Sequence, residues 1–176
     1  ARTEFPGLRL CLAPCHRGRV REVERIGKES GCTCRRRSEG EMMNEEVLLL
    51  DTHGELASFY RVASAAFVGG TLAPVGGHSL FEPALAGVPV LFGPNVWNVR
   101  EEASGLMGCG GGFRVSGAKR MVAVLMRLLK SRRAVLGAGR RAARFARGLQ
   151  GASARTVRAL AAVSYTHLTL PTKRIV

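Results

Sequence analysis

The stretch from Phe67 to Glu101 constrains the fold of this chain more than any other part of the sequence. An apolar run in it ends at Gly69-Gly70, and a Gly76-Gly77-His78 turn then opens a short segment of helical character that carries Glu82. Glycines between a strand and a helix leave room for a phosphate at the positive end of the helix, and a carboxylate just beyond them suits a ribose. The layout therefore predicts a site for a nucleotide-linked substrate.

Short apolar runs alternate with helical stretches along most of the chain. This alternation predicts an α/β fold, with a Rossmann-like parallel sheet and helices on both of its faces. Ligands of such sheets bind at the carboxyl ends of the strands. The predicted strands cover 8–13, 33–37, 47–50, 65–68, 88–92 and 113–115. The predicted helices cover 17–30, 55–63, 79–86, 98–107 and 118–163, the last with breaks near 131 and 148–151.

Length and composition predict a single core. With 176 residues, 46% of them hydrophobic, the chain is long enough for one well-buried domain, which we place at 1–163. Residues 164–176 are rich in threonine and strand-forming residues and follow an arginine-alanine helix, so we interpret them as a non-native tail. The chain begins at Ala1 and is already strand-like by Leu8, and we expect it to be the downstream part of something longer. No apolar run approaches the ~20 residues of a membrane span.

The chain is strongly basic, with a formal net charge of +14. Basic surfaces attract nucleic acids and anionic lipids alike. Aromatic residues make up only 6% of the chain, and no stacking platform interleaves with the basic residues, which argues against a single-strand-binding module. Solvated arginine-rich helix faces, an anionic membrane surface and acidic substrates remain open as explanations of the charge.

Five cysteines form neither a disulfide framework nor a standard zinc spacing. A metal site built from Cys15, His16, Cys32 and Cys34 is an alternative to ordinary reduced thiols. We favour the thiols and expect no metal site.

Two predicted strand ends carry polar residues suited to a ligand. The first is Pro14-Cys15-His16, where free backbone N–H groups at a helix start could hold an anion, or where the chain makes an ordinary turn. The second is His53-Gly54-Glu55, where Gly54 would let a ligand approach the main chain. Thr52 and Glu55 also match a capping box, which would explain both residues structurally.

The third strand end is the glycine-rich segment itself. Gly76 and Gly77 permit backbone conformations that wrap a phosphate, next to His78. Glu82 is predicted to accept the ribose hydroxyls, although a second capping box, Ser79-x-x-Glu82, competes for its carboxylate. Asn98 either caps the following helix or reaches the ligand.

Six segments, taken in order, resemble the carboxyl-terminal half of 3-deoxy-D-manno-octulosonic acid (Kdo) transferase. The likeness covers roughly Leu8 to Ala162. Any one motif is weak, whereas the ordered set is specific. The segments are Ala13–Arg17, Asp51–Leu56, Phe67–Leu72, Gly76–Pro83, Pro89–Pro94 and Asn98–Glu101.

The resemblance implies the second domain of a GT-B glycosyltransferase, which binds the nucleotide sugar. It implies inverting transfer of Kdo from CMP-Kdo to lipid A precursor, without a metal ion or cofactor, in lipopolysaccharide biosynthesis at the cytoplasmic face of the bacterial inner membrane. The general base would lie in an amino-terminal acceptor domain outside this chain, so no catalytic residue is expected here. The CMP contacts carried over fall on Pro14, Cys15, His53, Gly54, Glu55, Ser79, Leu80, Phe81 and Glu82.

Four positions depart from the family pattern. Cys15 stands where the family usually has arginine, and His53 where it has an apolar residue. Ser79 replaces a usual asparagine and Asn95 a usual histidine. Two alternative functions remain: a GT-B domain that uses a UDP-sugar, and a basic nucleic-acid-binding module.

Overall fold

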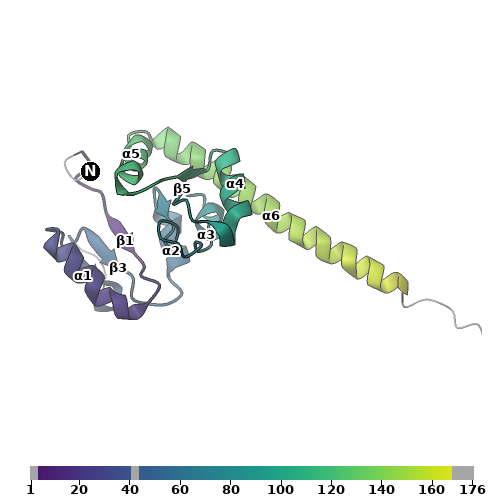
Figure 1. Cartoon of the computed structure of the whole chain (residues 1–176), viewed down its shortest axis with the longest axis horizontal. Helices are drawn as coiled ribbons and strands as arrows, with labels where there is room; N and C mark the ends of the chain where they lie inside the picture. Colours follow the sequence, from purple (N-terminus) through teal and green to yellow (C-terminus); the bar gives the residue numbers. More distant parts are fainter. Residues whose placement is uncertain (1–3, 41–43, 168–176) are drawn as a thin grey trace, which may run out of the picture.

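The computed structural model describes residues 4–40 and 44–167, and its strands form two parallel three-stranded sheets (Figure 1). The first has the order β1 (Leu10–Leu12), β3 (Val47–Leu49) and β2 (Cys34–Arg36). The second has the order β4 (Ala66–Phe67), β5 (Val90–Phe92) and β6 (Gly112–Arg114). The predicted α/β class with parallel strands is confirmed.

The sequence predicted one sheet where the structure has two. The strand order and the chain connectivity leave β1 and β4 as edges, and each is only two or three residues long. Leu10 of β1 is 50% exposed and Phe67 of β4 is 37% exposed. Strands this short offer few backbone groups for hydrogen bonds to another strand. The alternation of strands and helices in the sequence therefore could not predict whether the two sheets join.

One helix covers a face of the first sheet. After a 3₁₀ turn at Arg17–Arg19, α1 (Val20–Glu29) packs Val20 and Val23 against Val47 and Leu49 of β3. The outer side of α1 carries ion pairs within the helix, such as Lys28 Nζ to Glu24 Oε1 at 2.7 Å. Glu24 also pairs with Arg36 of β2, which fastens the helix to the sheet edge.

The second sheet has helices on both faces, as predicted. On one face lie α3 (Phe81–Leu85), α4 (Arg100–Gly108) and α6 (Arg132–His167), and on the other lies α5 (Ala118–Leu129). The small residues Ala142 and Ala146 of α6 are fully buried in the core of this face. They pack in one cluster with Leu80, Val90, Phe92 and Leu106. The remaining helix, α2 (Leu56–Val62), lies against α3.

The boundary between α5 and α6 falls where the sequence predicted it. Ser131 separates them, and its Oγ accepts a hydrogen bond from the N–H of Ala134 at 3.2 Å. The predicted break at 148–151 is wrong, because α6 continues to His167 and runs past the rest of the chain (Figure 1). A glycine in a helix costs about 1 kcal/mol relative to alanine, which good helix formers on either side offset here.

The predicted tail begins inside this helix. Residues 164–167 continue α6, and 168–176 lie outside the described residues, so the interpretation of 164–176 as non-native stays a prediction. None of the described helices combines the length and the apolar character that crossing a bilayer requires.

Candidate nucleotide site

The loop after β1 lines a cleft. Pro14, Cys15 and His16 surround it together with Arg19 and the start of α1, and its volume is about 230 Å³. Cys15 and His16 are both exposed. The α-helix begins at Val20 with no side-chain cap, so the backbone groups nearest the cleft belong to the preceding 3₁₀ turn. This loop therefore presents a thiol and an imidazole to solvent beside a helix start.

The loop after β3 is held by hydrogen bonds to a neighbouring segment. Asp51 accepts bonds from the hydroxyl and the N–H of Ser38, at 2.6 and 2.9 Å. These bonds, the hydroxyl first, lower the pKa of the Asp51 carboxyl. The loop is therefore anchored to residues that follow β2, and His53 and Gly54 at its tip are exposed.

Glu55 is engaged within the protein. Its carboxylate accepts a hydrogen bond from the Thr52 hydroxyl and pairs with Arg37 at 3.0 Å. These two partners, Thr52 first, lower the pKa of Glu55. The predicted capping box is wrong, because α2 begins at Leu56 without a side-chain cap and Thr52 bonds the Glu55 side chain. To contact a ligand, Glu55 must share its carboxylate with Arg37.

The glycine-rich loop is folded against the loop after β5. Gly76 has φ +99°, and a Cβ there would lie 2.4 Å from Asn98 Nδ2 and 2.5 Å from Trp97 Nε1. The Asn98 N–H donates to the Gly76 carbonyl at 3.2 Å, and its side chain donates to Val75. Glycine at 76 is thus required for the contact between the two loops. Asn98 does not cap α4, whose N-cap residue is Val99.

A buried threonine joins the ends of β4 and β5. Thr71 is 0% exposed; its hydroxyl donates to the Val68 carbonyl at 2.6 Å and accepts from the Gly93 N–H at 2.8 Å. Its carbonyl accepts from the Asn95 N–H at 2.9 Å. Sequence reasoning missed Thr71, and the only signal for it was a polar residue directly after a strand and a glycine pair.

The start of α3 is capped by a distant residue. Glu102 of α4 accepts a hydrogen bond from the Leu80 N–H at 2.8 Å, and the Ser79 hydroxyl accepts one from Phe81 at 3.2 Å. The alternative in which Glu82 forms a capping box with Ser79 is therefore wrong. Glu82 is exposed, and no hydrogen bond or ion pair to its carboxylate occurs among the described residues. Its carboxylate is free to accept hydrogen bonds from a ligand.

Several predicted contacts can involve only the main chain. Leu80 is fully buried and Phe81 packs on the same core, so neither side chain faces solvent freely. Gly76 is buried as well, whereas Gly77 is partly exposed and His78 is exposed. The N–H groups of Gly77 and His78 donate to the carbonyls of Gly70 and Gly69, at 2.9 and 3.4 Å. These bonds close the turn on itself.

One side chain lies near charged groups from both parts of the chain. Burial raises the pKa of Tyr60 on α2, and the nearby charges of Glu82 and Cys11 raise it further. Tyr60 thus lies near both β1 and α3, and α2 itself contacts α3. The cleft beside Cys15, however, is lined by none of the described residues from the loops at 51–55 and 69–79. Helix α2, which follows the second loop, contacts α3, which follows the third, whereas the first loop lines a cleft of its own.

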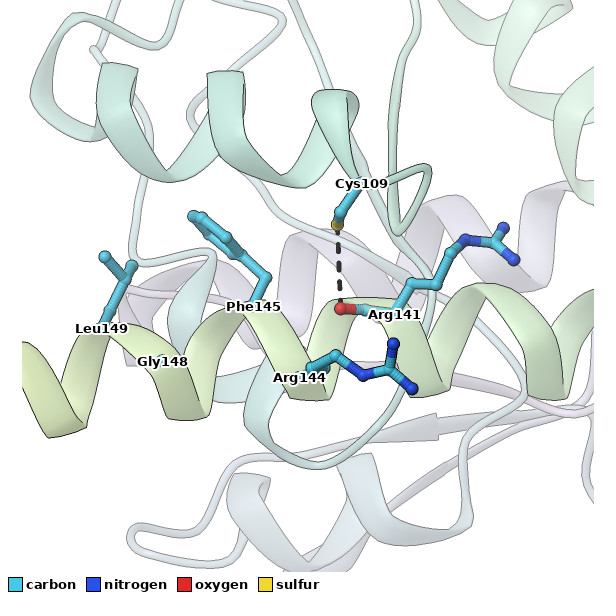
Figure 2. Close-up of a pocket in the computed structure, with 6 residues that line it drawn as sticks. All are labelled: Cys109, Arg141, Arg144, Phe145, Gly148 and Leu149. Atoms are coloured by element: carbon cyan, nitrogen blue, oxygen red, sulfur yellow. Dashed lines mark hydrogen bonds between the residues drawn. The ribbon is translucent and has the colours of Figure 1, made fainter.

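A larger cavity lies elsewhere, where α4 ends beside α6. It measures about 530 Å³ and is lined by Cys109, Arg141, Arg144, Phe145, Gly148 and Leu149 (Figure 2). Cys109 Sγ donates to the Arg141 carbonyl at 3.7 Å. The sequence prediction included none of these residues. In the described part of the chain, no group of three or more His, Cys, Asp or Glu side chains is placed to hold a metal ion.

Comparison with known proteins identifies similar enzymes. No family model matches the chain. The chain is 32% identical over 131 residues to 3-deoxy-D-manno-octulosonic acid transferase from Aquifex aeolicus, covering 74% of this chain and 36% of the relative. It is 33% identical over 164 residues to the enzyme of the same name from Bordetella pertussis, covering 90% of this chain and 38% of the relative.

A solved structure has the same fold. It is the crystal structure of the C-terminal CMP-Kdo binding domain of WaaA from Acinetobacter baumannii, with a TM-score of 0.76 and 26% identity. The match covers 82% of this chain and 76% of that one. The chain thus spans less than two fifths of the curated relatives, at 36% and 38%, and most of the solved domain.

Proposed function

Because this chain belongs to the Kdo transferase family as its carboxyl-terminal domain, we propose that it binds CMP-Kdo at the loops that follow β1, β3 and β4. These loops lie at the carboxyl ends of parallel strands, where α/β folds bind nucleotides. The family relationship favours this reading over a UDP-sugar domain and over a nucleic-acid-binding module.

The exposed carboxylate of Glu82 carries the proposal. Glu102 occupies the Leu80 N–H, so Glu82 has no role in capping α3 and points its acceptor oxygens to solvent. A carboxylate with both oxygens available can accept from both hydroxyls of a ribose. Ser79 and His78 lie next to it, where the phosphate of a nucleotide would follow its sugar.

In the full-length enzyme, the bound donor would serve transfer of Kdo to lipid A precursor. Transfer with inversion requires a general base that removes the proton of the acceptor hydroxyl as it attacks, while CMP leaves. We place that base in the acceptor part of the enzyme, outside this chain, and the reaction at the cytoplasmic face of the inner membrane. The reaction would need no metal ion or cofactor, and the enzyme would meet an anionic membrane surface.

Calorimetry with CMP and UDP tests the donor proposal. CMP should bind the chain and raise its Tm, because a ligand specific for the native state stabilises it, and UDP should do neither. Glu82→Ala should weaken CMP binding by about tenfold to a hundredfold, the range expected for charged hydrogen bonds. The control is Glu101→Ala, which replaces an exposed glutamate of the neighbouring helix α4 and should bind CMP normally.

Two results would overturn the donor proposal. The first is UDP binding as tight as CMP binding, which would support the UDP-sugar alternative. The second is unchanged CMP affinity in Glu82→Ala. A separate assay with CMP-Kdo and lipid A precursor should give no transfer by the purified chain. Transfer by the chain alone would contradict the placement of the general base outside this chain.

A further inference from the structure

The charge of this chain is divided very unevenly along the sequence. All thirteen acidic residues lie within the first 102 positions, alongside twelve of the basic residues. Residues 103–176 contain fifteen lysines and arginines and no aspartate or glutamate. The whole positive excess therefore belongs to residues 103–176, which include β6, α5 and α6.

Four arginines of α6 share one face of the helix. Arg133, Arg140, Arg144 and Arg147 follow one another at intervals of seven, four and three residues, which places them in one row. All four are exposed, and Ala138, Ala142 and Ala146 on the opposite face are buried. We refer to these four residues as the arginine row. It extends over about 21 Å of straight helix, at 1.5 Å per residue.

The arginine row has no acidic partners. Among the described residues, no ion pair involves any of its four side chains, and Lys130, which follows α5, pairs with Glu4. Helix α1 is also rich in basic residues, yet there Arg25 pairs with Glu29 at 2.7 Å and Lys28 with Glu24. A general preference for arginine would affect both helices, so it does not explain why α1 has glutamates beside its basic residues and α6 has none.

Apolar side chains lie beside the basic ones. Leu136 lies on α6 between Arg133 and Arg140 and is 46% exposed, and Val122 of α5 is 45% exposed. Arg144 also lines the cavity of about 530 Å³, where Phe145 and Leu149 extend from α6 toward α4 and Arg144 extends away from them (Figure 2). Exposed leucine and valine among arginines are typical of helices that lie on a membrane surface.

We propose that the arginine row of α6 docks this domain on the surface of an anionic phospholipid bilayer. This inference rests on the proposed function, since an enzyme that glycosylates a lipid works at a membrane, and it adds the attachment face. A straight row of cations suits a flat anionic surface, where each arginine keeps its guanidinium at headgroup level and its stem against apolar groups.

A nucleic acid is the other polyanion to consider, and the side chains disfavour it. Proteins that bind single strands stack the bases on exposed aromatic rings. In the described part of the chain beyond Glu102, the aromatic residues with described side chains are Phe113 and Phe145, and both are partly buried. The arginine row thus offers charge without a stacking surface.

Vesicle flotation tests the docking face. The purified 176-residue chain is mixed with phosphatidylcholine vesicles that contain or lack phosphatidylglycerol, and the partition coefficient is measured at low and high salt. The row variant replaces Arg133, Arg140, Arg144 and Arg147 by Gln. The control variant replaces Arg9, Arg21, Arg25 and Arg61 by Gln, so each variant loses four positive charges from a net charge of +14.

The wild-type chain should bind anionic vesicles and not neutral ones, and salt should weaken the binding. The partition coefficient of the row variant should fall by about a hundredfold to a thousandfold, and that of the control by less than about tenfold. The reason is that only charges near the vesicle surface contribute to binding. Thermal melts establish that both variants fold, and CMP calorimetry on both separates this test from that of the donor site.

Equal losses in the two variants would overturn the proposal, since they would show attraction by net charge alone. Absent binding of the wild-type chain to anionic vesicles at low salt would also overturn it. Tighter binding to single-stranded RNA than to anionic vesicles at the same salt would assign the row to a nucleic acid instead. Failure of CMP to bind would leave the vesicle result intact and would count only against the donor site.

Discussion

Glu102 on α4 accepts a hydrogen bond from the backbone N–H of Leu80 at 2.8 Å, twenty-two residues earlier in the chain. The bond satisfies a donor at the start of α3 and fastens that helix to its neighbour. It also leaves Glu82, the carboxylate that the sequence pattern assigned to the same role, available to a ligand.

The first prediction concerns this bond. Glu102→Ala should lower the free energy of unfolding by about 1–3 kcal/mol, because the Leu80 N–H loses a charged acceptor. Urea denaturation measures the change, and Glu101→Ala is the matched control on the same helix turn. CMP affinity should fall as well, because Glu82 can then fold back onto the freed N–H. A loss of stability no larger than in the control would show that water replaces the carboxylate.

Two glycines with positive φ should differ in their tolerance of a side chain. Gly54 has φ +81° and open space around a Cβ, whereas at Gly76 a Cβ would meet Asn98 and Trp97 within 2.5 Å. Gly54→Ala should cost about 1 kcal/mol of backbone strain. Gly76→Ala should cost roughly 2–4 kcal/mol, because displacement of the 93–98 loop adds to the strain. Thermal unfolding compares them, and equal Tm values would contradict the tighter surroundings of Gly76.

Gly54 also tests the ligand's position. If CMP approaches the main chain at this loop, the new methyl group of Gly54→Ala occupies the ligand's space. The loss of CMP binding free energy should then exceed the loss of free energy of unfolding. Calorimetry at a temperature where the variant is fully folded measures the effect. Unchanged affinity would place the ligand away from the loop after β3.

Cys15 offers a gain-of-function test. It is exposed in the cleft beside His16, and the resemblance to Kdo transferases implies arginine at this position. Cys15→Arg should tighten CMP binding by about tenfold, since a guanidinium can hold the phosphate through two hydrogen bonds. Cys15→Gln adds length without charge and should change little. A gain that persists undiminished in high salt would argue against a phosphate contact.

The Glu24 cluster predicts a dependence of stability on pH. Hydrogen bonds from Lys28 and then Arg36 lower the pKa of Glu24. A carboxyl whose pKa is lower in the folded state stabilises the protein above its unfolded pKa, about 4.3, and loses this contribution as the pH falls through the folded value. Glu24→Gln should therefore be less stable than wild type at pH 7, with a difference that shrinks below about pH 4.

Urea titrations across this pH range measure the effect of Glu24→Gln. Glu22→Gln is the control, because its pair with Arg19 is largely exposed and contributes little. A difference between Glu24→Gln and wild type that stays constant with pH would mean that packing, rather than charge, accounts for the loss.

Local patterns predicted most of the fold. Apolar runs at 47–50 and 88–92 became buried strands, and Ser131 ended one helix and began the next, because these signals lie within a few residues of the structure they determine. The division into two sheets was not predicted, because it depends on whether β1 and β4 meet, and they are distant in sequence.

The two capping boxes show the same limit at the candidate site. Thr52-x-x-Glu55 and Ser79-x-x-Glu82 have the correct spacing, yet Arg37 draws Glu55 away and Glu102 replaces Glu82. Both competitors come from elsewhere in the chain, so spacing alone could not reveal them. Thr71 was missed for the same reason, because its second partner, Gly93, is twenty-two residues away.

The buried hydroxyl of Thr71 has a consequence for any effort to redesign this domain. Since one side chain closes the turn after β4 and also holds the start of the turn after β5, neither turn can be rebuilt alone. Grafting a new sugar preference onto residues 76–82 would have to carry the 93–98 segment along with it. A redesign would therefore have to exchange the two turns together.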